Sequence, residues 1–306
     1  MNLKDLEILC DLPAGEYAPA EVGGVRTKTV RAGASLEVSC YPICRVTPAA
    51  RAEAARRRST PAMARLNRER AARRIRQLIE ANFTRRSLVI TLTWDYGIAL
   101  EADRMSRSQL RAAWEAEGLP LEEDDARRAL RNFFARIRYR MAEAERLKYL
   151  YVLESTHEPR DTDPDPLPAR YHFHLVLDAP GLTREAVKAL WPHGSVRADE
   201  LDLRGEGAAR LAGYFTKGKS VERVDGSGRR LRRWACSRNL KEPDTRVSDR
   251  TVSRRRAALV ARDVMGDGRE IFEKLYPGYR VVDGPTVKFS DFVPGAYIYA
   301  RLRKRE

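Results

Sequence analysis

Two short segments, KYLYVLE at residues 148–154 and RYHFHLVLD at residues 170–178, decide how this 306-residue chain folds. Tyrosine, valine, phenylalanine and leucine fill both segments, and these side chains suit the pleated, half-buried surface of a strand. Because successive side chains of a strand point to opposite faces, His172 and His174 share one face of the second segment. The other face of that strand is apolar and belongs in a core. We therefore predict two strands in a sheet that separates a hydrophobic core from a face carrying two imidazoles.

The neighbouring segments complete an α+β pattern. SLVITLTW at 87–94 is a short, β-branched apolar run and predicts a further strand. The acidic, proline-rich segment 158–170 predicts an exposed loop. Apolar spacing and capping residues predict four helices, at 106–117, 121–146, 183–191 and 206–219. This order favours an α+β fold with a central antiparallel sheet and flanking helices.

Charge is the most informative property of the composition. The chain has 58 Lys and Arg against 43 Asp and Glu, a net charge of +15. A surplus of this size opposes compaction and suits a polyanion, with nucleic acid a better candidate than an anionic membrane surface. A hydrophobic content of 43% excludes wholesale disorder, and no apolar run approaches the ~20 residues of a membrane span. Since the first residues lack the order of a signal peptide and four cysteines make no disulfide framework, we expect a cytoplasmic protein without a membrane partner.

Basic residues gather on both sides of the predicted core. Ten arginines, Arg73 and Arg74 among them, lie between 51 and 76 with only two glutamates. Such a tract predicts contacts with phosphates, although a solvated helix face has the same composition. VSRRRAALVAR at 252–262 and RLRKR at 301–305 would add to these contacts. We expect three regions, a basic N-terminal region at 1–86, a core at 87–243 and a basic C-terminal region at 244–306.

The two histidines of the second strand are candidate metal ligands. Side by side on one face, His172 and His174 would present two nitrogen ligands to one ion, a set that suits zinc or a transition metal. Glu154 ends the preceding strand, so an antiparallel partner would bring it alongside as a third ligand. His157 is the competing third ligand. The alternative is a pair of surface histidines on a half-exposed strand.

Tyr214 and Lys217 form a second candidate pair, in the segment Tyr-Phe-Thr-Lys. On a helix, residues three apart share a face, so the phenol and the ammonium would be neighbours. A nearby cation favours the phenolate, which is the nucleophilic form, and Lys217 could equally hold a phosphate. In the alternative interpretation Tyr214 is a half-buried helix residue and Lys217 its solvated neighbour.

The combined motifs resemble the HUH endonucleases, and among these the single-tyrosine rolling-circle replication initiators of phages and plasmids. Thr91-Leu92-Thr93 looks like the first motif of that family, HFHLVLD at 172–178 like the second, and 214–217 like the third. WACSRNLKEP at 234–243 is similar to the segment that follows the tyrosine in phage-type replication proteins. The long acidic loop 158–170 departs from the family pattern.

The resemblance implies an RRM-like nuclease core that nicks and joins single-stranded DNA at a specific site, to start rolling-circle replication of a phage or plasmid. It implies that Tyr214 attacks the scissile phosphate, leaving a 5′-phosphotyrosine and a free 3′-hydroxyl. The cofactor implied is Mg²⁺ or Mn²⁺, with three ligands, His172, His174 and Glu154. Arg238 and Asn239 are expected to contact phosphates or bases of the origin.

Three other interpretations compete with this one. GYFTKGKS at 213–220 matches a phosphate-binding loop, but a charged helical segment precedes it and no helix is predicted after it, so we regard the match as coincidence. Without an ATPase in the chain, duplex opening would come from a host helicase or supercoiling, and extension from a host polymerase. A non-enzymatic basic DNA-binding regulator would bind without cleaving. A transposase or relaxase would share the chemistry, although relaxases usually carry three clustered histidines and an N-terminal tyrosine, which this chain lacks.

Overall fold

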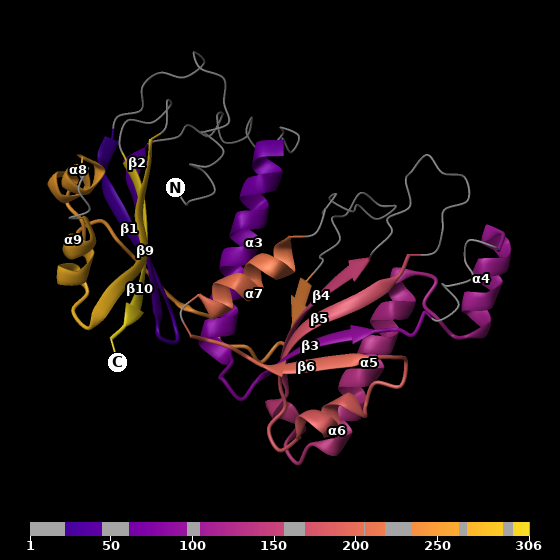
Figure 1. The fold of residues 1–306 in the computed structure, drawn as a ribbon. Helices are drawn as coiled ribbons and strands as arrows, with labels where there is room; N and C mark the ends of the chain where they lie inside the picture. Colours follow the sequence, from indigo (N-terminus) through magenta and orange to yellow (C-terminus); the bar gives the residue numbers. More distant parts are fainter. Residues whose placement is uncertain are drawn as a thin grey trace. The chain divides into compact units, whose positions relative to one another are not determined.

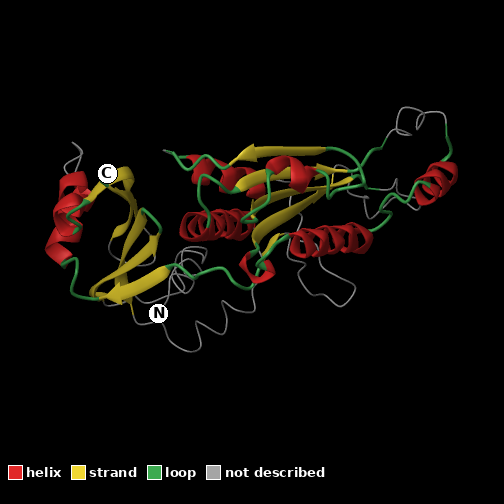
Figure 2. Ribbon diagram, turned by 90° about the horizontal axis from the view of Figure 1, so that it is seen from below, coloured by secondary structure: helices red, strands yellow, loops and turns green. Residues whose placement is uncertain are grey.

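The computed structural model divides the chain into two compact units, one formed by 1–81 with 242–306 (unit 1) and one by 82–241 (unit 2) (Figure 1). Each unit has its own five-stranded antiparallel sheet (Figure 2). This confirms the α+β class and adds a second sheet outside the predicted core. The structure describes these residues: 22–44, 61–96, 105–155, 169–204, 206–217, 234–262, 268–289 and 296–305.

The sheet of unit 2 has the predicted strands at its centre. Its strand order is β6-β3-β5-β4-β7, so the strand that carries the two histidines is the middle one. All four pairings are antiparallel. In that spatial order the bounds are Val196–Glu200, Leu88–Thr93, Tyr171–Asp178, Lys148–Ser155 and Trp234–Cys236.

Helices cover both faces of this sheet, with α5 and α6 on one side and α7 on the other (Figure 1). The bounds are Arg107–Ala116 for α4, Glu123–Arg140 for α5, Ala144–Arg146 for the 3₁₀ turn η3, Arg184–Lys188 for α6 and Gly207–Thr216 for α7. The expected helix 121–146 ends earlier, at Arg140, because Met141 is extended.

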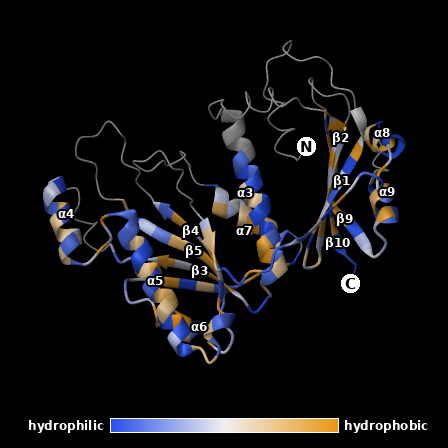
Figure 3. Cartoon of the chain, turned by 180° about the vertical axis from the view of Figure 1, so that it is seen from behind, coloured by the Kyte–Doolittle hydropathy of each residue, from blue (hydrophilic) through white to orange (hydrophobic). Residues whose placement is uncertain are grey.

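The apolar face of β5 packs against α5, as the alternation of the strand predicts. Phe133 and Phe134 are buried in one core cluster with Phe173, and the Phe134 ring stacks on Tyr149 with centroids 3.8 Å apart. Each buried phenylalanine contributes about 1.5–3 kcal/mol. Hydrophilic and hydrophobic residues are mixed along α5, as a half-buried helix requires (Figure 3). Packing on this side therefore fixes which face of β5 remains for the histidines.

Unit 1 joins the two ends of the chain in one sheet, in the order β8-β1-β2-β10-β9. N-terminal β1 and β2 pair with C-terminal β8 and β10, so the two basic regions expected separately form one folded unit. The strand bounds, in that spatial order, are Asp244–Ser248, Val22–Ala32, Ser35–Cys44, Ala296–Lys304 and Tyr279–Phe289. Its helices are α3 (Pro61–Asn82), α8 (Arg254–Arg262) and α9 (Gly268–Leu275).

A buried polar cluster holds α3 against the other strands of unit 1. Glu37 on β2 is only 3% exposed, and its carboxylate accepts a 2.7 Å bond from Arg76 of α3. The same guanidinium donates to the Tyr299 hydroxyl at 2.8 Å. The turn between β1 and β2 needs Gly33, whose φ is +57°, and a Cβ there would lie 2.2 Å from the carbonyl oxygen of Glu80.

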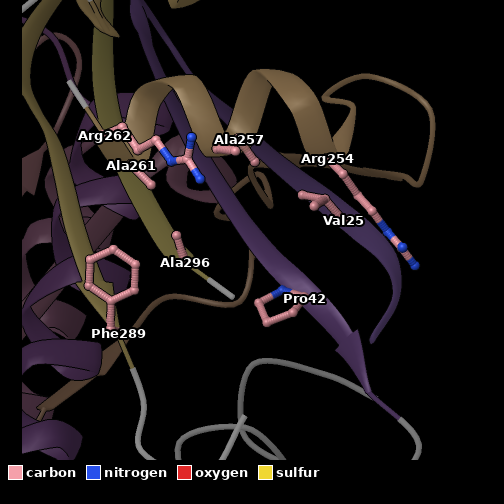
Figure 4. A pocket seen from close by; sticks show the side chains of 9 residues that line it. Val25, Pro42, Arg254, Ala257, Ala261, Arg262, Phe289 and Ala296 are labelled. Atoms are coloured by element: carbon pink, nitrogen blue, oxygen red, sulfur yellow. The ribbon is translucent and has the colours of Figure 1, made fainter. Parts of the chain in front are cut away.

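An apolar groove of about 460 Å³ lies beside α8 in unit 1 (Figure 4). Small side chains such as Val25, Ala257 and Ala261 line it, and Arg254 and Arg262 lie at its ends. Its lining has no histidine and no carboxylate, so it offers no ligand to a metal ion. Among the described helices of both units, none is long and apolar enough to cross a membrane.

Candidate active site

The pairing of β4 with β5 brings a carboxylate to the two imidazoles. Glu154 lies directly opposite His172 in the antiparallel register. One oxygen of Glu154, Oε2, lies 3.0 Å from Nε2 of His172 and 3.3 Å from Nε2 of His174. The three ligand atoms all lie within 4.8 Å of one another. The structure thus brings together the three residues that the sequence put forward as a metal site.

The chemistry of these donors fits a divalent cation. Two imidazole nitrogens and a carboxylate oxygen converge on one point, a set used by transition metals and compatible with Mn²⁺. Hydrogen bonds from His172 and His174 hold the pKa of Glu154 down at about 2, against the opposing effect of burial. Glu154 is therefore negatively charged at any ordinary pH. The site can bind a metal ion, whose identity the donor set does not fix.

The cluster is buried at one end and open at the other. The side chain of His174 is 7% exposed, whereas those of His172 and Glu154 are 20% and 24% exposed. A substrate can therefore approach from the side of His172 and Glu154, while His174 lies deeper and depends on the protein for its hydrogen bonds.

Helix α7 places Tyr214 over the histidine face. The Tyr214 hydroxyl lies 3.2 Å from Nε2 of His174, and the two rings meet edge to face with centroids 4.9 Å apart. Phe215 is buried and anchors the helix, whereas Tyr214 is 47% exposed. The backbone of Gly207 approaches Asp202 so closely that a Cβ would lie 2.0 Å from its carbonyl oxygen. Glycine at the first position of α7 therefore permits this approach of the helix.

The charge that acts on the Tyr214 phenol differs from the one we expected. Burial, and after it the negative charge of Glu154, raise the pKa of Tyr214 above its usual value. The expected effect of Lys217 was in the opposite direction. Lys217 caps the C-terminus of α7, where its backbone N–H donates to the carbonyl of Tyr214 at 3.1 Å, and its side chain is exposed. In the absence of a cation the phenol is thus held in its protonated form.

Two further expectations concern the same segments. His157, the competing third ligand, lies outside the described residues. The resemblance of 213–220 to a phosphate-binding loop finds no support in the described part, because α7 continues through Thr216 and makes the first half of that segment helical. Residues 218–220 lie outside the described ranges.

Asn239 has a structural partner that sequence reasoning missed. Its side-chain amide donates to the carbonyl oxygens of Glu145 at 2.8 Å and Leu147 at 3.0 Å. Together with β7, which pairs with β4, these bonds attach the segment after β7 to the start of β4. Both amide hydrogens are thus used inside unit 2, whereas neighbouring Arg238 is exposed. A DNA contact by either residue stays a prediction.

Arg73 and Arg74 belong to unit 1 and have partners there. Arg74 forms an ion pair with Glu242. The guanidinium of Arg73 lies over the Tyr299 ring, 4.6 Å from its centroid, and its Nε lies 3.9 Å from a carboxylate oxygen of Glu37. Their expected phosphate contacts stay a prediction.

Two residues next to the site carry contacts that sequence reasoning did not foresee. The Thr91 hydroxyl lies 3.1 Å from Nδ1 of His174. The Tyr96 hydroxyl accepts the backbone N–H of Tyr171 at 2.8 Å and donates to its carbonyl at 3.3 Å, which fixes the start of β5 just before His172. Their signal in the sequence is position alone, because both lie on or just after the strand that pairs with β5.

Residues 87–219 match the model of a protein family described as Replication-associated protein ORF2. The matched segment contains all four residues that meet in the site, Glu154, His172, His174 and Tyr214. Neither a curated protein nor a solved structure gives a significant match to the chain. The family match confirms the resemblance to rolling-circle replication initiators that the motifs indicated.

Proposed function

Because residues 87–219 match the replication-associated ORF2 family, which supports a rolling-circle replication initiator, we propose that the chain nicks and rejoins single-stranded DNA at a replication origin through Tyr214. One observation carries the proposal. The Tyr214 hydroxyl lies 3.2 Å from an imidazole nitrogen that also contacts the Glu154 carboxylate. A nucleophile and a candidate metal cluster therefore share one small volume.

The ligands proposed for the cation are His172, His174 and Glu154, and the ion proposed is Mg²⁺ or Mn²⁺. When bound, a divalent cation withdraws charge from a phosphate and stabilises the charge that develops during displacement. Glu154 supplies the negative charge that attracts the cation at ordinary pH, since its carboxylate stays ionised down to a pKa of about 2. The partial exposure of His172 and Glu154 leaves room for a DNA phosphate beside them.

Tyr214 is the proposed nucleophile. Its phenol oxygen forms a bond to phosphorus while the bond from phosphorus to the 3′ oxygen breaks, and that oxygen takes up a proton as the phenol gives one up. The product is a 5′-phosphotyrosine and a free 3′-hydroxyl, and reversal rejoins the strand because the phosphodiester energy is kept in the covalent link. Positive charge beside Glu154 would offset the effect that raises the pKa of Tyr214, so the phenolate would form more readily in the loaded site.

Exposed basic residues around the site suit the DNA backbone. Lys217 lies one turn of α7 beyond Tyr214, where it could hold the scissile phosphate. Arg238 is exposed after β7 and is proposed as a phosphate contact, with Arg73 and Arg74 as weaker candidates because both already have partners in unit 1. A host helicase and a host polymerase are the proposed protein partners.

The test is covalent capture on DNA. The purified chain is incubated with a labelled single-stranded library of random sequence and Mn²⁺, and protein–DNA adducts are resolved on a denaturing gel and sequenced. We expect an adduct in the wild type that is lost in Tyr214→Phe and in EDTA. Tyr139→Phe is the matched control, because Tyr139 is 89% exposed at the end of α5 and should keep the adduct.

Two results would contradict the proposal in different ways. An adduct that persists in Tyr214→Phe would retain the enzyme and reject the assigned nucleophile. Tight, EDTA-insensitive binding without any adduct across the library would instead favour the non-enzymatic DNA-binding regulator.

A further inference from the structure

His174 is the deepest member of the cluster, and its second ring nitrogen has a partner. β3 and β5 pair so that Thr91 lies opposite His174 and Thr93 opposite His172. Both threonines therefore face the histidine side of the sheet. The Thr91 hydroxyl lies 3.1 Å from Nδ1 of His174, whose Nε2 contacts Glu154 and Tyr214.

We propose that Thr91 is a positioning residue, whose hydroxyl holds the His174 imidazole so that Nε2 faces the cation and Tyr214. The inference rests on the proposed function in one respect only, the binding of a cation by Nε2. Flanking residues Ile90 and Leu92 are fully buried, so the strand could not supply an apolar side chain at position 91 without leaving Nδ1 unpaired.

The chemistry of imidazole explains why a hydroxyl suits this position. A nitrogen that binds a metal ion must offer its lone pair, so the other nitrogen then carries the hydrogen and needs an acceptor. When Nε2 instead carries the hydrogen and donates to Glu154, Nδ1 needs a donor. A hydroxyl can rotate to serve as either. Thr91 therefore satisfies His174 both before and after the cation binds.

His172 does not need the same support. Its side chain is 20% exposed, against 7% for His174, so water can reach it. Among the described residues, no hydrogen bond joins the Thr93 hydroxyl to His172. Thr93 thus resembles Thr91 in type, strand and face and differs in this one contact, which makes it the matched control.

The first experiment measures Mn²⁺ affinity of the full-length chain by calorimetry, without DNA. Thr91→Val keeps the shape and removes the hydroxyl, and loss of a hydrogen bond to a metal-ligating histidine typically weakens metal binding by about 10- to 100-fold. Thr91→Ser restores the hydroxyl and should restore most of the affinity. Thr93→Val should bind like the wild type. Wild-type affinity in Thr91→Val, or no rescue by Thr91→Ser, would overturn the inference.

The second experiment reads the imidazole directly. The chain has four histidines, so ¹⁵N-histidine spectra are simple, and His174→Gln assigns the resonance. In the metal-free chain the Nδ1 resonance of His174 should shift in Thr91→Val and stay in place in Thr93→Val. If the wild type binds no Mn²⁺ and forms no adduct, the proposed function fails, while this spectrum still tests the contact: an unchanged Nδ1 resonance in Thr91→Val would refute it.

Discussion

Replacing Asn239 with alanine should destabilise unit 2 without changing its affinity for single-stranded DNA. The side-chain amide makes two hydrogen bonds to backbone carbonyls, at 2.8 and 3.0 Å. At about 0.5–1.5 kcal/mol each, their loss should cost roughly 1–3 kcal/mol. The higher part of that range is favoured because Leu147, which supplies one of the carbonyls, is buried. For a unit of this size the cost corresponds to a fall in melting temperature of roughly 2–10 °C.

The assay uses the placement of the tryptophans. All four, Trp94, Trp114, Trp191 and Trp234, lie within 82–241, so tryptophan fluorescence during urea unfolding reports on unit 2. DNA affinity is measured by fluorescence anisotropy well below the melting temperature, at several salt concentrations. The neighbouring Arg238→Ala should behave in the opposite way, with unchanged stability, weaker binding and a salt slope smaller by about 0.7. Unchanged stability in Asn239→Ala together with weaker DNA binding would refute the structural role of this amide.

Three further predictions concern buried charge and burial. Glu37→Gln should destabilise unit 1 by about 3–5 kcal/mol, because it leaves the Arg76 guanidinium buried without its carboxylate, and the double replacement by methionine should recover most of the loss; circular dichroism in urea checks both. The pKa of Glu154 lies at about 2, below its unfolded value, so its contribution to stability is complete above about pH 4.5 and is lost as pH falls towards 2; the metal-free wild type should therefore lose its advantage over Glu154→Gln across that range in urea titrations, and a constant difference would contradict this. Burial raises the pKa of the Cys40 thiol to about 11, so peptide mapping after iodoacetamide treatment at pH 8 should find Cys40 unmodified in the native chain and modified in denaturant.

The sequence sufficed for those parts of the site that follow from strand geometry. The strands expected at 148–154 and 170–178 are observed as Lys148–Ser155 and Tyr171–Asp178. Once two such strands pair in antiparallel fashion, a period of two places the histidines on one face and the carboxylate beside them. The meeting of Glu154 with His172 is thus a consequence of alternation and register.

The fold of unit 1 could not be derived in this way. The pairing of β2 with β10 joins residues such as Cys40 and Ile298, which lie far apart in the chain. Strand propensity indicates that a segment is extended, but it carries no information on which distant strand becomes its partner. The same holds for the buried pair of Glu37 and Arg76, because Arg76 belongs to a tract whose composition suggested only solvent or phosphate contacts.

Asn239 and Thr91 demonstrate why a motif does not by itself assign a role to each of its residues. Both lie in segments that resemble family motifs, and both were equally available for contact with DNA in the sequence. The hydrogen bonds decide between the roles: the Asn239 amide is used on two carbonyls of its own unit, and the Thr91 hydroxyl is used on a buried nitrogen of the site. A buried polar group must find a partner, so the partners of each motif residue have to be identified before it is assigned to the substrate. By that criterion Arg238 and Lys217, which are exposed, remain the basic residues of unit 2 best suited to meet a phosphate.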